Sequence, residues 1–187
     1  MRLNLNDYYE KISELIKLNS DVKNRIKRTA DLFKSCHKKG GKVVFFGNGG
    51  SASTSSHISV DLTKNAKVRS VNFNESNLIT CFSNDYAYDK WIEKAIEFYC
   101  DKKDIVVLIS VSGTSKNILN AAKFCQKKNI SLITFSGFKK KNSLIRINKK
   151  GFNFWVNSKS YNQVEIVHHI YLLSIVDYII GKSNYSV

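Results

Sequence analysis

Apolar positions along this 187-residue chain follow two patterns that alternate from one end to the other. Short runs of consecutive apolar residues are typical of strands buried on both faces, and apolar residues that recur every three or four positions are typical of helices. The runs predict strands at 43–46, 105–109 and 130–135, and less regular apolar stretches predict strands at 68–73 and 152–156. The periodic segments predict helices at 8–18, 22–40, 51–64, 88–100, 115–128 and 161–180, while 78–82 suits either element.

Strands separated by helices imply right-handed crossovers and a parallel sheet that is covered on both faces. We therefore predict a doubly wound α/β fold with five strands, and the length suits a single domain over residues 1–187. The two helices within residues 1–40 precede every strand and carry apolar positions on more than one face. Because a five-stranded core has no obvious place for them, we expect residues 1–40 to pack in a homo-oligomer, either a dimer or a tetramer.

Two of the predicted strands run directly into loops of small residues, Gly-Asn-Gly-Gly-Ser at 47–51 and Ser-Val-Ser-Gly-Thr-Ser at 110–115. Each loop opens a predicted helix, where free backbone N–H groups and the helix dipole attract an anion. Neither loop has the spacing of a dinucleotide fingerprint or the Gly-Lys-Ser/Thr ending of a nucleotide triphosphate loop. Hydroxyls in place of a lysine suit a monophosphate ester, so the sequence predicts a phosphorylated ligand at the carboxyl edge of the sheet.

The formal net charge is +15, from 30 Lys and Arg against 15 Asp and Glu. A basic surface attracts nucleic acid whatever the fold, but no recognition motif accompanies this charge. Many of the lysines stand in pairs where predicted helices end, and cations there complement the helix dipole. Nucleic acid is therefore not an expected partner.

The sequence predicts a cytoplasmic protein without a membrane partner. It contains no run of about 18 consecutive apolar residues, the length of a membrane span. The first residues lack the apolar core of a signal peptide. The four cysteines are far apart and include no C-x-x-C pair, which agrees with a reducing compartment.

Three motifs, in this order, resemble the sugar isomerase (SIS) domain family, and within it the phosphoheptose isomerases. They are Gly-Asn-Gly-Gly-Ser-Ala at 47–52 followed by His57 and Asp61, Ser-Asn-Asp-Tyr-Ala-Tyr-Asp at 83–89, and the segment 110–117. The resemblance spans the whole chain and implies a flavodoxin-like sheet, the SIS fold, in a homotetramer. It also implies an aldose–ketose isomerase that converts sedoheptulose 7-phosphate to D-glycero-D-manno-heptose 7-phosphate for cell-surface polysaccharide, either lipopolysaccharide or capsule.

The resemblance implies a phosphate site, a sugar contact at Asp85 and a catalytic pair. The predicted phosphate-binding residues are Asn48, Gly49, Gly50, Ser51, Ser110, Ser112, Thr114 and Ser115. The family pairs a glutamate on the helix after the first loop, where this chain has Asp61, with a histidine on the last helix, where it has Leu173. Glu165 aligns with a glutamine of the family.

Isomerisation requires a base to move a proton between adjacent carbons and a donor to stabilise the enediolate oxygen. Glu165 or Asp61 is the predicted base, and His168 or His169 is the predicted acid. Because adjacent residues on a helix point about 100° apart, only one of the two histidines is expected to face the site.

Zinc is a candidate cofactor, since the corresponding positions bind it in some relatives. Its candidate ligands here are His57, Asp61, Glu165 and one of the adjacent histidines, with His168 as the first choice.

Two further hypotheses remain open from the sequence. One is an isomerase of the same chemistry that acts on another sugar phosphate. The other is a non-catalytic phosphosugar-binding module that keeps the phosphate loops. Both bind a sugar phosphate, so turnover is what separates an enzyme from a binding module.

Overall fold

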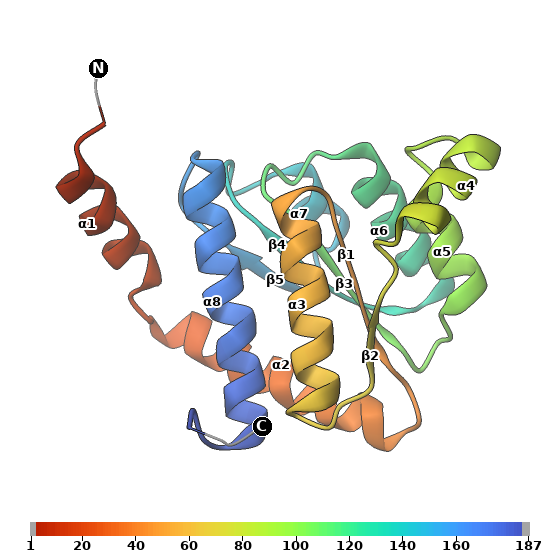
Figure 1. Cartoon of the computed structure of the whole chain (residues 1–187), viewed down its shortest axis with the longest axis horizontal. Helices are drawn as coiled ribbons and strands as arrows, with labels where there is room; N and C mark the ends of the chain where they lie inside the picture. The colour runs from red at the N-terminus through yellow and green to blue at the C-terminus, as the bar shows by residue number, and fades with distance from the viewer. Residues whose placement is uncertain (1–2, 185–187) are drawn as a thin grey trace.

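The computed structural model describes residues 3–184 as a five-stranded sheet with helices on both faces (Figure 1). All neighbouring strands are parallel, in the order β2-β1-β3-β4-β5. The strands are β1 Val43–Gly47, β2 Ser70–Asn72, β3 Ile105–Ser110, β4 Ser131–Ser136 and β5 Phe152–Trp155. The predicted doubly wound α/β fold with a five-stranded parallel sheet is therefore confirmed.

Eight helices lie within the part of the chain that the structure describes. They are α1 Leu5–Ile16, α2 Ser20–Lys38, α3 Gly50–Lys64, α4 Ser76–Tyr86, α5 Trp91–Tyr99, α6 Lys116–Lys128, α7 Ser143–Ile147 and α8 Tyr161–Ile180. The segment that suited either element, 78–82, is helical, because Glu75 accepts hydrogen bonds from two free N–H groups and starts α4 there. The sequence pattern did not predict α7, whose five residues bury only Leu144.

Alternate side chains of each central strand enter two separate cores. Val43 and Phe45 of β1 face the layer formed by α2, α3 and α8, whereas Val44 and Phe46 face α5 and α6. Both faces are fully covered, so the β1 and β3 strands are buried along their whole length. This explains why they read as continuous apolar runs in the sequence.

The order of the strands reverses direction between β1 and β3. From β1 the chain crosses to β2 on one side, and from β3 it crosses to β4 and β5 on the other. The pairing of Gly47 with Ile109 brings the two strand ends level, so both small-residue loops leave the sheet side by side. In sheets of this kind, ligands bind at such a switch point beyond the carboxyl ends of the strands.

The longest helix, α8, is the one described helix whose length and apolar composition would allow it to cross a membrane. In this structure it packs against α2, α3 and β4 instead. Seven of its residues are buried in the core, from Val164 to Val176. We therefore regard α8 as a core helix.

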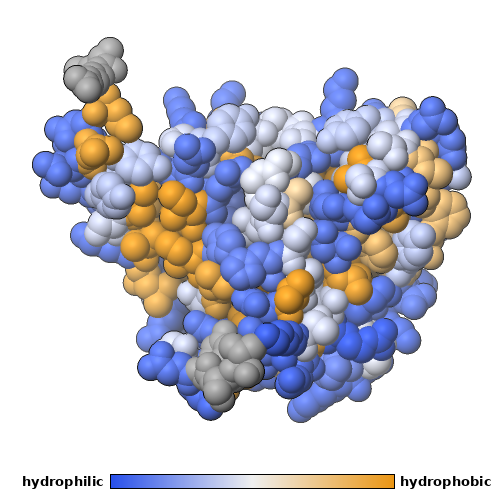
Figure 2. Space-filling view, viewed as in Figure 1, coloured by the Kyte–Doolittle hydropathy of each residue, from blue (hydrophilic) through white to orange (hydrophobic). Residues whose placement is uncertain are grey.

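The first helix, α1, projects from the layered body (Figure 1). It begins at Asn4, whose side chain accepts a hydrogen bond from the Asn6 N–H, and none of its residues is buried. Leu15 packs partly against the core, but other apolar side chains stay exposed, with Leu5 64% and Tyr9 69% accessible. Hydrophobic surface is visible around α1 and next to α8 (Figure 2). The expectation that the core has no place for both N-terminal helices is wrong for α2, which buries Ala30 and Phe33 in the core of this chain. The use of residues 1–40 in an oligomer stays a prediction.

Candidate active site

The first loop connects β1 to α3 through a conformation that requires glycine. Gly49 has φ +56° and ψ −124°, a region that L-residues rarely adopt. A Cβ on Gly47 would lie 2.5 Å from the Ser51 backbone, so this position excludes any side chain. Asn74 holds the loop from outside, because its amide donates to the Gly47 carbonyl at 2.8 Å and accepts from the Gly47 N–H at 3.3 Å. The loop thus turns tightly into α3, where the Ser51 and Ala52 N–H groups bond to the Asn48 and Gly49 carbonyls at 3.1 and 2.9 Å.

The second loop carries the hydroxyl groups between β3 and α6. Ser110 Oγ donates to Ser115 Oγ at 3.3 Å, and Ser112 and Thr114 share a hydrogen bond of 2.8 Å. Gly113 has φ +65°, and a Cβ there would lie 2.3 Å from Asn142 Oδ1. The hydroxyls lie close together at the first turn of α6, where neutral donors and the helix dipole can share an anion.

The two loops form one unit through a pair of asparagines. Asn48 Nδ2 donates to Asn117 Oδ1 at 3.1 Å, and Asn117 Nδ2 donates back to Asn48 Oδ1 at 2.9 Å. Tyr88 Oη also donates to Asn48 Oδ1, at 3.3 Å. Sequence analysis missed the roles of Asn117 and Tyr88, although both lie beside or within the motifs that it used.

A cavity of about 540 Å³ lies between α3 and α8, next to the first loop. It is lined by Gly50, Ser53, Thr54, His57, Glu165, Ile166, His169 and Ile170. The carboxylate of Glu165 reaches the loop itself, since a Cβ on Gly50 would lie 2.3 Å from Glu165 Oε2. Glu165 therefore stands where the first loop meets the cavity.

Three cavity side chains form a chain of hydrogen bonds that ends on Asp61. His169 Nε2 lies 3.0 Å from His57 Nδ1, and His57 Nε2 lies 3.3 Å from Asp61 Oδ2. At the other end, Thr54 Oγ1 lies 3.4 Å from His169 Nδ1. One set of tautomers satisfies all three contacts, with each group donating toward Asp61. Such a chain can pass a proton along its length.

Burial lowers the pKa of His169, and the neighbouring His57 lowers it further, while Asp61 acts in the opposite direction. His169 is consequently neutral at neutral pH. A neutral imidazole can donate a proton at one nitrogen and accept one at the other.

His168 faces away from the cavity, which corrects the prediction that it belongs to the site. Its side chain is 1% exposed, and Nε2 lies 3.2 Å from the carbonyl of Ser136 at the end of β4. Burial lowers the pKa of His168 to about 4, against the opposing effect of the Ser136 contact. The 100° step between neighbouring helix positions places His169 in the cavity and His168 in the core.

The structure does not bring Asp85 to the cavity through any contact of its own. Its carboxylate bonds within α4, with Asn84 Nδ2 at 3.1 Å and Cys81 Sγ at 3.8 Å. From this part of the chain, Tyr88 is the residue that reaches the first loop. The predicted contact between Asp85 and the sugar remains a prediction.

The candidate zinc ligands are divided between the cavity, which His57 and Glu165 line, and the core, where His168 lies. Among residues 3–184, no group of three or more His, Cys, Asp or Glu side chains is arranged to hold a metal ion. His168 points into the core, and both nitrogens of His57 already contact other side chains. The set of His57, Asp61, Glu165 and His168 therefore does not fit a zinc site in this arrangement.

Residues 7–137 match the family described as SIS domain. A phosphoheptose isomerase from Cytophaga hutchinsonii is 32% identical over 119 residues, which are 61% of this chain and 62%, less than two thirds, of that protein. A phosphoheptose isomerase from Thermodesulfovibrio yellowstonii is 31% identical over 149 residues, which are 76% of this chain and 73% of that protein.

The solved structure of a phosphoheptose isomerase from Neisseria gonorrhoeae has the same fold. It aligns with a TM-score of 0.83 at 21% sequence identity, over 94% of this chain and 97% of that one.

Proposed function

The chain belongs to the SIS domain family, among its phosphoheptose isomerases, and we propose that it interconverts sedoheptulose 7-phosphate and D-glycero-D-manno-heptose 7-phosphate. One observation of the site carries this proposal. The Glu165 carboxylate lies against Gly50, where the first of the two loops meets a cavity that contains a histidine pair backed by Asp61. A phosphate at the loops would thereby place the rest of a sugar next to a base and a proton carrier.

The loops supply the phosphate site in this proposal. Its proposed donors are backbone N–H groups of the two loops and the hydroxyls of Ser51, Ser110, Ser112, Thr114 and Ser115. Ser51 and Ser110 are buried, so their hydroxyls are already desolvated, and binding of the ester costs little further desolvation free energy. Asn48, Gly49 and Gly50 shape the first loop around the ester.

The reaction moves one proton between carbons 1 and 2 of the sugar. In the ketose-to-aldose direction, Glu165 removes a proton from carbon 1, the electron pair forms the carbon–carbon double bond of an enediol, and oxygen 2 gains a proton. The proton on oxygen 1 then leaves, the carbonyl forms at carbon 1, and Glu165 returns its proton to carbon 2.

His169 is the proposed carrier of the proton between the two oxygens. Its Nδ1 contacts Thr54 on the cavity wall and its Nε2 contacts His57, which leads to Asp61. A proton accepted at Nδ1 can be balanced by transfer from Nε2 toward His57. A neutral imidazole suits this role, because it can accept a proton at one ring nitrogen and donate one from the other.

Another sugar phosphate is the second candidate substrate. At the position where the resemblance implies a catalytic histidine, Leu173 packs against the hydrophobic core. The acid of this chain therefore sits four positions earlier, at His169, and an altered set of side chains around the sugar would suit a different carbon skeleton.

A homotetramer in the cytoplasm is the proposed state of the enzyme. The exposed apolar side chains of α1 support association, since a monomer would leave Leu5 and Tyr9 in water. Light scattering of the purified full chain should give the mass of four copies, and the mass of one copy would contradict association.

The proposed activity is tested by proton NMR of the full chain with sedoheptulose 7-phosphate. We expect a new aldose anomeric signal, and we expect inorganic phosphate to compete with the substrate. Conversion of a different ketose phosphate alone would favour the second candidate. Competition between inorganic phosphate and sugar phosphates, without conversion of any sugar phosphate, would indicate a non-catalytic binding module.

A further inference from the structure

His168 is a polar side chain in the core, next to the residues assigned to the reaction. It is 1% exposed, and its Nδ1 has no hydrogen-bond partner. An apolar ring would fill the same space beside Phe135, whose ring centroid is 5.6 Å away, without an unpaired nitrogen. Because burying an unpaired polar atom is unfavourable, the bond from Nε2 to the Ser136 carbonyl is the feature that the histidine adds.

Ser136 connects that bond to the segment that follows β4. Its hydroxyl accepts a hydrogen bond from Asn142 Nδ2 at 3.0 Å. Asn142 is 3% exposed and also donates to the carbonyls of Gly137 and Lys139, at 3.3 and 3.1 Å. The segment 136–142 is therefore tied together around one buried amide.

The same segment holds the second phosphate loop. The Gly137 N–H donates to the Val111 carbonyl at 2.7 Å, and the Leu144 N–H donates to the Gly113 carbonyl at 3.0 Å. Asn142 Oδ1 lies so close to Gly113 that a Cβ there would be 2.3 Å from it. The loop backbone at 111–113 thus rests on Gly137, Asn142 and Leu144, and Asn142 is bonded to Ser136, whose carbonyl contacts His168.

A second contact joins the segment to α8 one turn before His168. A Cβ on Gly137 would lie 2.6 Å from Val164 Cγ2, so the glycine backbone packs directly on Val164. Val164 precedes Glu165, and His168 precedes His169. The two residues that touch the segment are therefore the immediate neighbours of the proposed base and the proposed proton carrier.

We propose that His168 is a positioning residue, which couples the phosphate loop at 111–113 to the rotation of α8 that aims Glu165 and His169 into the cavity. The proposal rests on the proposed function of the site. It assigns no contact between His168 and the substrate. Binding of a phosphate at the loop would affect the rotation of α8 through the contacts of Gly113, Asn142 and Ser136.

The first test compares His168→Phe with His168→Gln in the full chain. Phenylalanine keeps the packing against Phe135 but removes the donor, whereas glutamine retains an N–H that can reach the Ser136 carbonyl. We expect kcat to fall about tenfold in His168→Phe with KM changed less than twofold, and His168→Gln to recover most of kcat.

Thr29→Val is the matched control, because Thr29 is also fully buried with an unpartnered polar atom but lies on α2, away from the site. It should leave both kcat and KM unchanged. Equal loss of kcat in His168→Phe and His168→Gln, or loss that only follows a lower melting temperature, would overturn the proposal.

The second test does not depend on turnover, so it separates this proposal from the proposed function. Hydrogen exchange of α8 amides at 164–170 is measured with and without inorganic phosphate. We expect phosphate to slow this exchange in the wild type and in His168→Gln but not in His168→Phe. Absence of protection in the wild type would overturn the coupling, whether or not the protein proves to be an isomerase.

Discussion

Close approaches that only glycine permits determine how individual residues form this site. Gly50 lets the Glu165 carboxylate touch the start of α3, while Gly47 lets the chain turn against the Ser51 backbone. The two positions differ in what a side chain would meet. At Gly50 it is the mobile end of Glu165, and at Gly47 it is fixed backbone.

Gly50→Ala should therefore reduce activity without unfolding the protein. The added methyl group displaces Glu165 from the loop, and a base misplaced by about 1 Å can lower kcat about a hundredfold. Alanine suits a helix better than glycine, so the melting temperature should stay the same or rise slightly. Steady-state kinetics and thermal unfolding check both parts.

Gly47→Ala serves as the contrast, because its methyl group would lie 2.5 Å from the Ser51 carbonyl group. It should lower the melting temperature and weaken phosphate binding together. If Gly50→Ala kept the wild-type kcat, Glu165 would not act from the position that the structure gives it.

Among the elements, the two phosphate loops depend on each other through the helices that they start. The paired amides of Asn48 and Asn117 fix the start of α6 against the first loop. Removing one amide leaves the other without its partner, and the loops can then separate.

Asn117→Ala should weaken the binding of inorganic phosphate about tenfold, because a pair of hydrogen bonds holds the loops in register. Calorimetric titration with phosphate measures this directly. Lys123→Ala, on the exposed face of the same helix, is the control and should bind like the wild type. Unchanged affinity in Asn117→Ala would show that the loops bind phosphate independently.

The sequence predicted every strand. The central strands β1 and β3 are continuous apolar runs because both faces of the sheet are covered there, whereas β2 and β5 contain Asn72 and Asn153. It did not predict α7, since five residues are too few to show helical periodicity. It found Glu165, His57 and Asp61 but could not choose between His168 and His169. That choice depends on the rotation of α8 about its axis, which tertiary packing of residues such as Val164 determines.

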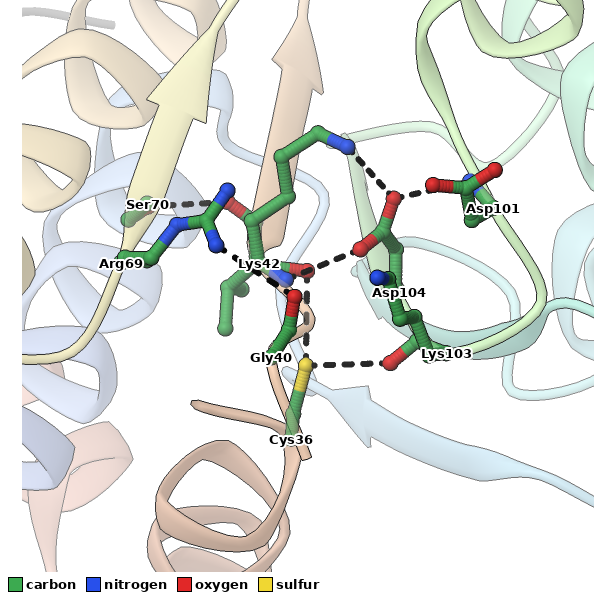
Figure 3. Close-up of polar contacts among 9 residues, drawn as sticks. Cys36, Gly40, Lys42, Arg69, Ser70, Asp101, Lys103 and Asp104 are labelled. Atoms are coloured by element: carbon green, nitrogen blue, oxygen red, sulfur yellow. Dashed lines mark hydrogen bonds and ion pairs between the residues drawn. The ribbon is translucent and has the colours of Figure 1, made fainter. Parts of the chain in front are cut away.

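On the scale of the whole molecule, the two edges of the sheet have different roles. The carboxyl edge carries the two small-residue loops, and the amino edge carries a buried ion pair (Figure 3). There Asp104, 1% exposed, accepts from Lys42 Nζ at 2.6 Å, from the Lys42 N–H at 2.9 Å and from the Asp101 N–H at 2.8 Å. This cluster ties the start of β1 to the start of β3.

Asp104→Asn should lower the free energy of unfolding by about 3 kcal/mol at pH 7, because an amide cannot replace a carboxylate that accepts from three donors. Burial acts to raise the pKa of Asp104, but the hydrogen bonds and the charge of Lys42 outweigh it, so the pKa is lowered.

The wild type should hold this stability above the ordinary pKa of an aspartate and lose it as the pH falls through the lowered value. Urea unfolding at several pH values should show the two proteins converging in acid. Asp31→Asn is the control. It removes an exposed ion pair with Lys34 on α2 and should change the free energy of unfolding little. A constant difference at all pH values would mean that the charge of Asp104 is not what stabilises this edge.

The central claim is that Glu165 moves a carbon-bound proton of a sugar held by the two loops. The most direct measurement is solvent deuterium incorporation at carbon 1 of sedoheptulose 7-phosphate and at carbon 2 of the aldose product in D₂O, with the wild type and Glu165→Gln compared at saturating substrate. We predict incorporation with the wild type, and none with Glu165→Gln even though that variant still binds inorganic phosphate. Incorporation at the wild-type rate in Glu165→Gln would contradict the account, because the proton would then be moved by another group.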